Sequence, residues 1–299
     1  MNLRQLEYFL TVANEQNITK AAKKLNISQP PLSRSLMDLE SELGVTLFIR
    51  GKRSTELTPE GLLLKKRAQQ ILNLTHKATE EVQGLNKNVR GTLYLGLVEA
   101  KGPMLAAKWI SGFKKLYPDV TFNLWNGNSD ELTDRLRAGL LDAAITMEPF
   151  NNEILSGFRV DSEPWVAMIP INDPLASSDA PLHIRELNGK ELIIPSRRSR
   201  SGEISSWFEK EGAEPSFKVV IANSSNACEL PKEGIGIAIF PASLGGAIDR
   251  DKVALRKILP EVTAYYLLSW EKEKTLSDPA NKFIEYVNSL TIKERSISI

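Results

Sequence analysis

Two short segments of this sequence gather the side chains best suited to bind an anion. Residues 50–53 read Arg-Gly-Lys-Arg, and residues 196–201 read Ser-Arg-Arg-Ser-Arg-Ser. Guanidinium, ammonium and hydroxyl groups donate hydrogen bonds to the oxygens of phosphates and carboxylates. Each segment also fits a plain solvent-exposed loop, because charged runs are common on protein surfaces. The elements that position each segment must decide between these interpretations.

Side chains that could catalyse a reaction are scarce. The sequence has one cysteine and two histidines, which leaves no disulfide framework and no histidine-rich metal site. It contains no Gly-rich phosphate loop and neither a Gly-x-Ser-x-Gly nor a His-Glu-x-x-His pattern. Cys228 is expected to pack in a helix rather than to react. We therefore predict a protein that is not an enzyme and needs no cofactor and no metal.

Charge is distributed unevenly along the 299 residues. Residues 1–90 hold 14 basic and 9 acidic side chains, whereas the remainder holds 24 basic and 28 acidic ones. A basic front favours contact with a polyanion. The length and composition fit about two globular domains. The longest uncharged stretch, Gly234 to Ile248, spans 15 residues and contains Pro241, so we expect a soluble, cytoplasmic protein without a membrane partner.

The first 58 residues have the pattern of short helices followed by a hairpin. Apolar residues recur at helical spacing over 3–13 and 21–25, and Asn17 or Thr19 fits the cap of the second helix. A third helix is predicted over 28–43. Its apolar face is formed by Leu32, Leu36, Leu39 and Leu43.

The remaining face of that third helix and the hairpin after it carry the side chains that would contact DNA. A helix, a turn and a second helix can place polar residues in the major groove, and a basic hairpin can follow phosphates or the minor groove. The predicted DNA-binding residues are Ser28, Gln29, Pro30, Ser33, Arg34, Arg50, Lys52 and Arg53.

About sixty residues of this region resemble a known signature without a gap. The matching residues are Ala21-Ala22 with Leu25, Ser28 to Arg34, Leu39-Glu40, Leu43-Gly44, Leu47-Phe48-x-Arg50-x-x-Arg53 and Leu57 to Gly61. They look like the N-terminal signature of LysR-type transcriptional regulators. The resemblance implies a winged helix-turn-helix that binds promoter DNA, with Gln29, Ser33 and Arg34 in the recognition helix and Arg50 and Arg53 in the wing.

A long helix is predicted from Pro59 to about Gln83, capped by Thr58. Its apolar positions alternate in steps of four and three, the rhythm of a helix that packs along another helix. The alternative is packing on its own domain, but a module of sixty residues is too small to cover the length of this seam, so pairing of two copies is favoured. The predicted dimer positions are Leu64, Ala68, Ile71, Thr75, Ala78, Val82 and Leu85.

From residue 90 the pattern changes to alternating strands and helices, which predicts parallel sheets flanked by helices. The spacing suits two α/β lobes of the periplasmic-binding-protein type, and residues 139–145 and 234–241 resemble motifs of the LysR-type effector domain. The predicted fold is thus α/β, with a winged helix-turn-helix at 1–58, a linker helix at 59–89 and a two-lobed effector domain at 90–299. By the same resemblance, one lobe spans about 91–161 plus 266–299 and the other about 162–265.

Ligands of such folds bind where loops leave the carboxyl ends of strands. The candidate effector-binding residues at these ends are Glu99, Ala100, Lys101, Asn128, Ser129, Met147, Glu148, Arg197, Arg198, Ser199, Arg200, Ser201, Asn223 and Asn226. We expect a small anionic metabolite. Many members of the family carry a hydroxyl where this chain has Glu99, a carboxylate that repels an acid unless Lys101 offsets it, or that instead attracts a cationic group.

A regulator is therefore the favoured function. The expected partners are promoter DNA, a small-molecule effector, a second copy in a homodimer, two further copies in a homotetramer by family resemblance, and RNA polymerase as a candidate. A solute-binding protein or enzyme on the same two-lobed fold is the alternative, but it leaves the basic N-terminal module without a role. An architectural DNA-binding protein would leave over 200 residues without one.

Overall fold

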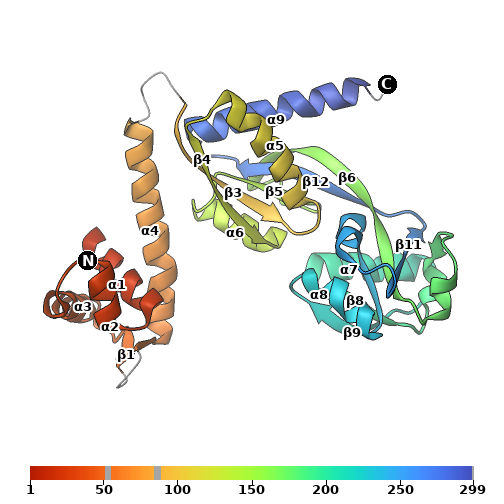
Figure 1. The fold of residues 1–299 in the computed structure, drawn as a ribbon, viewed down its shortest axis with the longest axis horizontal. Coiled ribbons are helices and arrows are strands. Elements are labelled where there is room, and N and C mark those ends of the chain that lie inside the picture. The colour runs from red at the N-terminus through yellow and green to blue at the C-terminus, as the bar shows by residue number, and fades with distance from the viewer. Residues whose placement is uncertain (51–54, 84–88, 298–299) are drawn as a thin grey trace. The chain divides into compact units, whose positions relative to one another are not determined.

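The computed structural model describes residues 1–50, 55–83 and 89–297 of the chain (Figure 1). The chain divides into two compact units, one of Met1–Asn86 with Ala138–Leu140 and the other of Lys87–Arg137 with Leu141–Ile299. None of the helices in the described ranges combines the length and the apolar character that a membrane crossing requires.

The first unit consists of helices and a small antiparallel hairpin. Polar side chains accept hydrogen bonds from free backbone amides where the first two helices begin. Asn2 and Gln5 form a reciprocal capping box, and Asn17, rather than Thr19, caps the second helix by accepting from the amide of Lys20 at 3.0 Å. The elements are α1 Leu3–Glu15, α2 Ile18–Lys24, α3 Gln29–Leu43, β1 Phe48–Arg50, β2 Thr55–Leu57 and α4 Pro59–Gln83.

The apolar face of α3 is shorter than its sequence pattern predicts. Leu32, Leu36 and Leu39 are at most 1% exposed, whereas Leu43 is 39% exposed. Gly44 ends the helix in the left-handed conformation at φ 69°, and the chain leaves the core there. Leu43 therefore lies beyond the last turn that packs on the core.

Helix α4 starts close against the hairpin. The Thr58 hydroxyl accepts a hydrogen bond from the amide of Gly61 at 2.9 Å and donates one to the carbonyl of Thr46 at 2.7 Å. A Cβ on Gly61 would lie 2.2 Å from the carbonyl oxygen of Leu47. Glycine is required here because no side-chain carbon fits between this helix and the backbone before β1.

The second unit has two lobes that share one long strand. The strand order is β4-β3-β5-β12-β6-β10-β8-β9, and β11 pairs with both β6 and the short β7. Strand β6 pairs with β12 through its first part and with β10 and β11 through its last part. The strands are β3 Gly91–Val98, β4 Val120–Gly127, β5 Ala143–Met147, β6 Leu155–Pro170, β7 Leu182–His183, β8 Glu191–Pro195, β9 Ser216–Ile221, β10 Ile237–Pro241, β11 Val253–Leu259 and β12 Thr263–Glu271.

The prediction of purely parallel sheets is wrong. Strand β3 is parallel to β4 and β5, and β8 is parallel to β9 and β10, but β6, β11 and β12 join their neighbours antiparallel, apart from the parallel pair of β11 and β7. Strand β12 comes from the end of the chain and lies between β5 and β6, antiparallel to both.

Helices cover both lobes (Figure 1). Helices α5 and α9 lie together, because Phe113 stacks edge-on against Phe283 with ring centroids 5.2 Å apart. Helix α6 packs closely on β3, where a Cβ on Gly96 would lie 2.5 Å from Leu132. The helices are α5 Gly102–Leu116, α6 Ser129–Arg137, α7 Arg198–Lys210, α8 Ser225–Glu229 and α9 Asp278–Ile297, with short 3-10 turns at Pro174–Ser177, Ile184–Leu187, Leu230–Glu233 and Ala242–Ala247 (η4).

Candidate ligand pocket and DNA-binding face

The second unit contains a pocket at the carboxyl ends of its parallel strands. Its empty space, including the open mouth, is about 610 Å³. Residues that end or follow β3, β4 and β5 form one wall, and residues that end or follow β8, β9 and β10 form the other. The lining residues are Val98, Glu99, Ala100, Asn128, Ser129, Met147, Trp165, Pro195, Ser196, Arg197, Arg200, Ile221, Ala222, Ser224, Phe240, Pro241 and Leu244.

The pocket gathers half of the residues predicted for an effector. The predicted residues on its wall are Glu99, Ala100, Asn128, Ser129, Met147, Arg197 and Arg200. Six others are not on the wall: Lys101, Glu148, Ser199, Ser201, Asn223 and Asn226. The side chain of Arg198 lies outside the described residues. Sequence reasoning missed most of the apolar wall, such as Ile221 and Phe240, because it searched the loops after the strands rather than the last strand residues.

Glu99 crosses the pocket. Its Oε2 accepts a hydrogen bond from the backbone amide of Ser224 at 2.6 Å, which joins the loop after β3 to the loop after β9. The next residue, Ala100, has a left-handed backbone with φ 70°, a conformation that is uncommon for a residue with a Cβ. The sharp turn at Ala100 leaves the Glu99 carboxylate at the pocket.

Lys101 does not act as the counterion of Glu99. Its ammonium pairs with Asp161 on β6 at 2.8 Å and also donates to the carbonyl of Ser162 at 3.3 Å. Of the two alternatives for Glu99, the one in which Lys101 offsets its charge is not supported, because the Lys101 ammonium is already paired with the Asp161 carboxylate. This ion pair joins the start of α5 to the strand shared by the two lobes.

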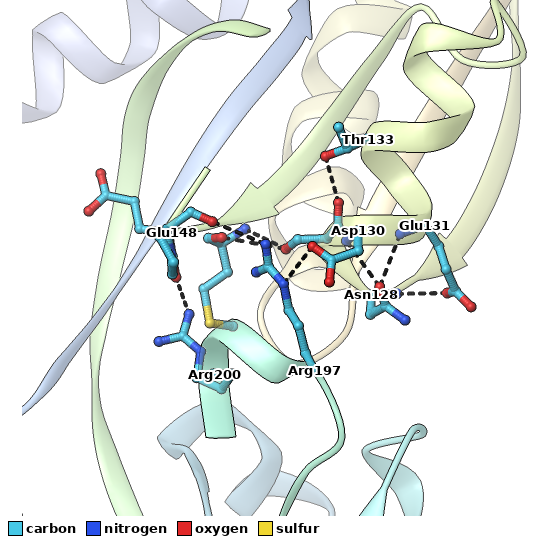
Figure 2. A network of polar contacts seen from close by, with 10 residues as sticks. Asn128, Asp130, Glu131, Thr133, Glu148, Arg197 and Arg200 are labelled. Atoms are coloured by element: carbon cyan, nitrogen blue, oxygen red, sulfur yellow. Dashed lines mark hydrogen bonds and ion pairs between the residues drawn. The ribbon is translucent and has the colours of Figure 1, made fainter. Parts of the chain in front are cut away.

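Asn128, which Figure 2 shows, and Ser129 use their polar atoms to hold the start of α6. The Asn128 Oδ1 accepts from the amides of Asp130 and Glu131, each at 3.0 Å. The Ser129 hydroxyl is buried and accepts from the amide of Met147 at 3.1 Å. These contacts fix the loop after β4 to the end of β5, so both side chains are positioned by the protein itself.

Two arginines from the start of α7 reach the opposite lobe, as Figure 2 shows. Arg197 donates to Asp130 at 2.8 Å and to the carbonyl of Pro149 at 3.1 Å. Arg200 donates to Glu203 at 2.6 Å and to the backbone carbonyl of Glu148. Both cations therefore have an acidic partner and a carbonyl partner, and both bridge the lobes.

Burial separates these two arginines. The side chain of Arg200 is 5% exposed, and its guanidinium lies 5.0 Å from the ring centroid of Trp165. Burial lowers the pKa of Arg200 from its ordinary value, and the nearby Glu203 opposes that shift; an arginine still stays charged. The Arg197 side chain is 14% exposed, but its partner Asp130 is 63% exposed. The contact that Arg200 makes between the lobes is thus more buried than the contact that Arg197 makes.

The predicted residues away from the pocket wall have other partners or surroundings. Both carboxylate oxygens of Glu148 accept from Arg159, at 2.7 and 2.8 Å. The Asn223 Oδ1 accepts from the amide and the hydroxyl of Ser225 at the start of α8. The remaining three differ in exposure: Ser199 and Asn226 are exposed and Ser201 is half-buried.

A buried polar cluster that the sequence did not reveal lies where β6 and β12 pass between the lobes. Glu163 accepts from the amide of Ser243 at 2.6 Å, from its hydroxyl at 2.8 Å, and from the phenol of Tyr266. Burial, together with the Glu163 charge, raises the pKa of Tyr266. Neutral Tyr266 and charged Glu163 therefore join both crossing strands to the turn η4. Alternation of polar residues along β6 was the only available signal.

The predicted DNA-binding face lies at the start of α3. The first residues of the helix are exposed: Ser28, Gln29, Pro30 and Arg34 are open to solvent, and Ser33 is half-buried. The Gln29 Oε1 accepts a hydrogen bond from the Thr19 hydroxyl on α2 at 3.3 Å. Ser28 occupies the cap position without a side-chain cap bond. Arg50 pairs with Thr55 through its backbone, whereas its side chain and residues Lys52 and Arg53 lie outside the described part.

Part of the predicted dimer seam on α4 packs against the core of its own unit. Ala68 is fully buried, and Leu64 and Ile71 pack half-buried against the same core. The first unit therefore covers the start of the predicted seam, where α1 contacts α4. Further along, Thr75 is half-buried and Ala78 is exposed, while the side chain of Val82 and all of Leu85 lie outside the described residues.

Comparison with known proteins agrees with both units. Residues 3–62 match the family described as bacterial regulatory helix-turn-helix protein, lysR family, and residues 86–291 match the family described as LysR substrate binding domain. Two regulators of Bacillus subtilis strain 168 are each 32% identical: BsdA over 95% of this chain and 99% of its own, and YybE over 97% and 99%.

Solved structures give the same result. The crystal structure of full-length CbnR with its target DNA is 25% identical, covers 97% of this chain and 99% of its own, and has a TM-score of 0.76. The family consists of transcriptional regulators rather than enzymes, so an enzyme on the same fold is not favoured. The chain belongs to the LysR family of transcriptional regulators and is a DNA-binding regulator with an effector-binding domain.

Proposed function

We propose that this regulator binds promoter DNA through α3 and the hairpin, and that a small molecule bound in the pocket changes how its DNA-binding parts are presented. The proposed division is residues 1–58 for DNA, 59–89 for pairing and 90–299 for the effector. Within the last part, the lobes are about 91–161 plus 266–299, and about 162–265.

One observation carries the effector role: two walls from different lobes face one pocket and are joined by few connections. The strands β6 and β12 connect the lobes, and side-chain contacts such as Glu99 to Ser224 bridge the opening. A molecule held between such walls contacts one arrangement of the lobes better than another. That difference in affinity is what lets a ligand shift a conformational equilibrium.

A substitution that fills the pocket tests this role in the full chain. Ala222 is on the wall and exposed, so Ala222→Phe should occupy ligand space with little effect on the core. A set of small metabolites would be screened for those that raise the melting temperature, because a ligand of the folded state stabilises it by mass action. We expect at least one to stabilise the wild type and not the variant. Equal stabilisation of both would refute the pocket as the site.

The DNA-binding role rests on the exposed start of α3. The structure of CbnR carries its target DNA, and by similarity we place promoter DNA against Gln29, Ser33 and Arg34. We expect Gln29 to contact bases and Arg34 to contact phosphates, because a neutral amide reads base edges whereas a guanidinium at the surface can also neutralise the backbone.

Two substitutions separate these contacts. Binding sites would first be selected from random duplex DNA with the full chain, and affinities would then be measured by anisotropy at several salt concentrations. Gln29→Ala should lose about 1–3 kcal/mol on selected sites and little on random DNA. Arg34→Ala should weaken both alike and flatten the salt dependence. Equal losses on both DNAs for Gln29→Ala would contradict this division.

We also propose a homodimer through α4, with a homotetramer and a contact to RNA polymerase resting on family resemblance alone. Because Leu64, Ala68 and Ile71 serve the core of their own unit, the pairing surface must use other positions. Leu63 and Leu74 are 60% and 58% exposed, and their separation of eleven residues places them on one helix face. An exposed apolar stripe of this kind favours pairing with a second copy.

A further inference from the structure

The charges around the pocket do not favour an anion. The charged side chains on its wall are Glu99, Arg197 and Arg200. Arg197 already pairs with Asp130, and Arg200 already pairs with Glu203. Among the described side chains, two cations thus face three carboxylates, and the wall with its direct partners carries one net negative charge. An entering carboxylate would have to displace Asp130 or Glu203 to gain a cation.

Glu99 is the group that holds the excess charge. Its only hydrogen bond within the described part of the chain is the one from the Ser224 amide to Oε2. The other oxygen, Oε1, has no partner there, although a carboxylate can accept up to about four hydrogen bonds. Glu99 is half-buried on the pocket wall. A hydrogen-bond donor with positive charge would satisfy this oxygen and neutralise the wall.

The rest of the wall is largely apolar and suits a hydrocarbon or aromatic body. Val98 and Met147 contribute from one lobe, and Ile221, Phe240 and Leu244 from the other. Ligand sites commonly combine such a surface with a few polar groups that fix orientation. The charged group that remains available among the described wall residues is an acceptor, the carboxylate of Glu99, whereas the indole N–H of Trp165, which is buried without a hydrogen-bond partner, is a neutral donor.

We propose that Glu99 determines specificity by binding a protonated amine carried on an apolar body. This inference rests on the proposed function, because it takes the pocket as the effector site. The ammonium donates to Oε1 of Glu99, while Oε2 keeps its bond to Ser224. One side chain then contacts both the ligand and the opposite lobe, so ligand binding is coupled to a contact between the lobes.

The test uses sets of three probes that share one apolar body and carry a positive charge, no charge or a negative charge. Phenethylamine, 2-phenylethanol and 3-phenylpropionate would be titrated at pH 7 into the full-length protein, with hexylamine, hexanol and heptanoate as an aliphatic series. Binding would be followed by tryptophan fluorescence, because Trp165 lies on the pocket wall. In at least one series, we expect the amine to bind about tenfold or more tightly than the alcohol and the acid.

The variant Glu99→Gln separates charge from geometry. A glutamine carbonyl can still accept from the Ser224 amide, so the contact between the lobes is retained while the negative charge is lost. We expect the amine to bind about tenfold more weakly to this variant, the alcohol to be unaffected and the acid to gain. Tighter binding of the acid to the wild type, or equal affinity of the amine for both proteins, would overturn the assignment.

The variant Ala222→Phe distinguishes failure of this inference from failure of the pocket. If an acid binds the wild type best and Ala222→Phe abolishes that binding, the pocket is the site and the amine assignment is wrong. If a probe binds Ala222→Phe as well as the wild type, the site itself is refuted and the amine assignment with it. If all six probes leave the fluorescence of the wild type unchanged, the amine assignment is overturned, and the metabolite screen with Ala222→Phe decides on the pocket.

Discussion

Two arginines that stand three residues apart offer a test of what holds the lobes together. Arg197 and Arg200 both reach from the start of α7 to the opposite lobe, and each has one carboxylate and one carbonyl partner. They differ in burial, since Arg200 is 5% exposed whereas the Asp130 partner of Arg197 is 63% exposed. The same substitution to methionine at each position isolates that difference.

The expected losses follow from solvent access. At Arg200, methionine removes two hydrogen bonds of a charged group inside the protein and leaves the Glu148 carbonyl without its donor. Such bonds are worth about 1.5–3 kcal/mol each, but Glu203 is 35% exposed and water can solvate it, so we expect a total of about 3 kcal/mol. At Arg197 the ion pair is screened by water, and about 1 kcal/mol or less is expected.

Tryptophan fluorescence measures this in the intact chain. All five tryptophans, at positions 109, 125, 165, 207 and 270, belong to the second unit, so the signal reports that unit alone. At about 2–4 °C for each kcal/mol, Arg200→Met should lower the melting temperature by roughly 6–12 °C, and Arg197→Met by less than about 4 °C. Equal shifts, or a wild-type melting temperature for Arg200→Met, would refute the argument from burial.

One further substitution and one chemical reaction test other parts of the molecule. Leu74→Glu should shift sedimentation of the full chain from dimer to monomer without unfolding the first unit, because Leu74 is 58% exposed; a dimer of unchanged stability would exclude this face of α4. Cys228 is buried, and burial raises the pKa of its thiol, so little thiolate exists at pH 7 and a thiol reagent should react slowly until the protein unfolds. Rapid reaction of the folded chain would contradict that.

The helices could be predicted from the sequence because residues close together in the chain determine where each helix begins and ends. Asn17 and Gly44 mark helix ends through chemistry that acts over a few residues, and apolar spacing marked the buried face of α3. The first part of β6 was missed for the opposite reason. It alternates between half-buried and exposed residues, and its stability comes from pairing with β12, about a hundred residues later. No short stretch of sequence contains both β6 and its partner β12, so local patterns cannot reveal this pairing.

A pocket lies at the strand ends where the sequence placed the effector site, and binding of an effector there stays a prediction. The chemistry of the pocket was harder to predict. Serines and arginines were expected to offer donors to a ligand, but Ser129 bonds to Met147, and Arg197 and Arg200 bond across the opening. The sequence shows which side chains can donate hydrogen bonds to a ligand. Only the tertiary structure shows whether those donors already bond to other groups of the protein.

Glu99 illustrates how this changes the functional argument. From sequence alone, its carboxylate had two opposite interpretations, and Lys101 was the natural residue to decide between them. The structure assigns Lys101 to Asp161 and Glu99 to the amide of Ser224, 125 residues away. Both contacts join residues that are far apart in the sequence. The net charge of the pocket wall therefore depends on which side chains pair in the structure, and not on the residue types alone. The charge of the ligand should therefore be argued from the one charged side chain on the described pocket wall that has no ionic partner, and that group is the carboxylate of Glu99.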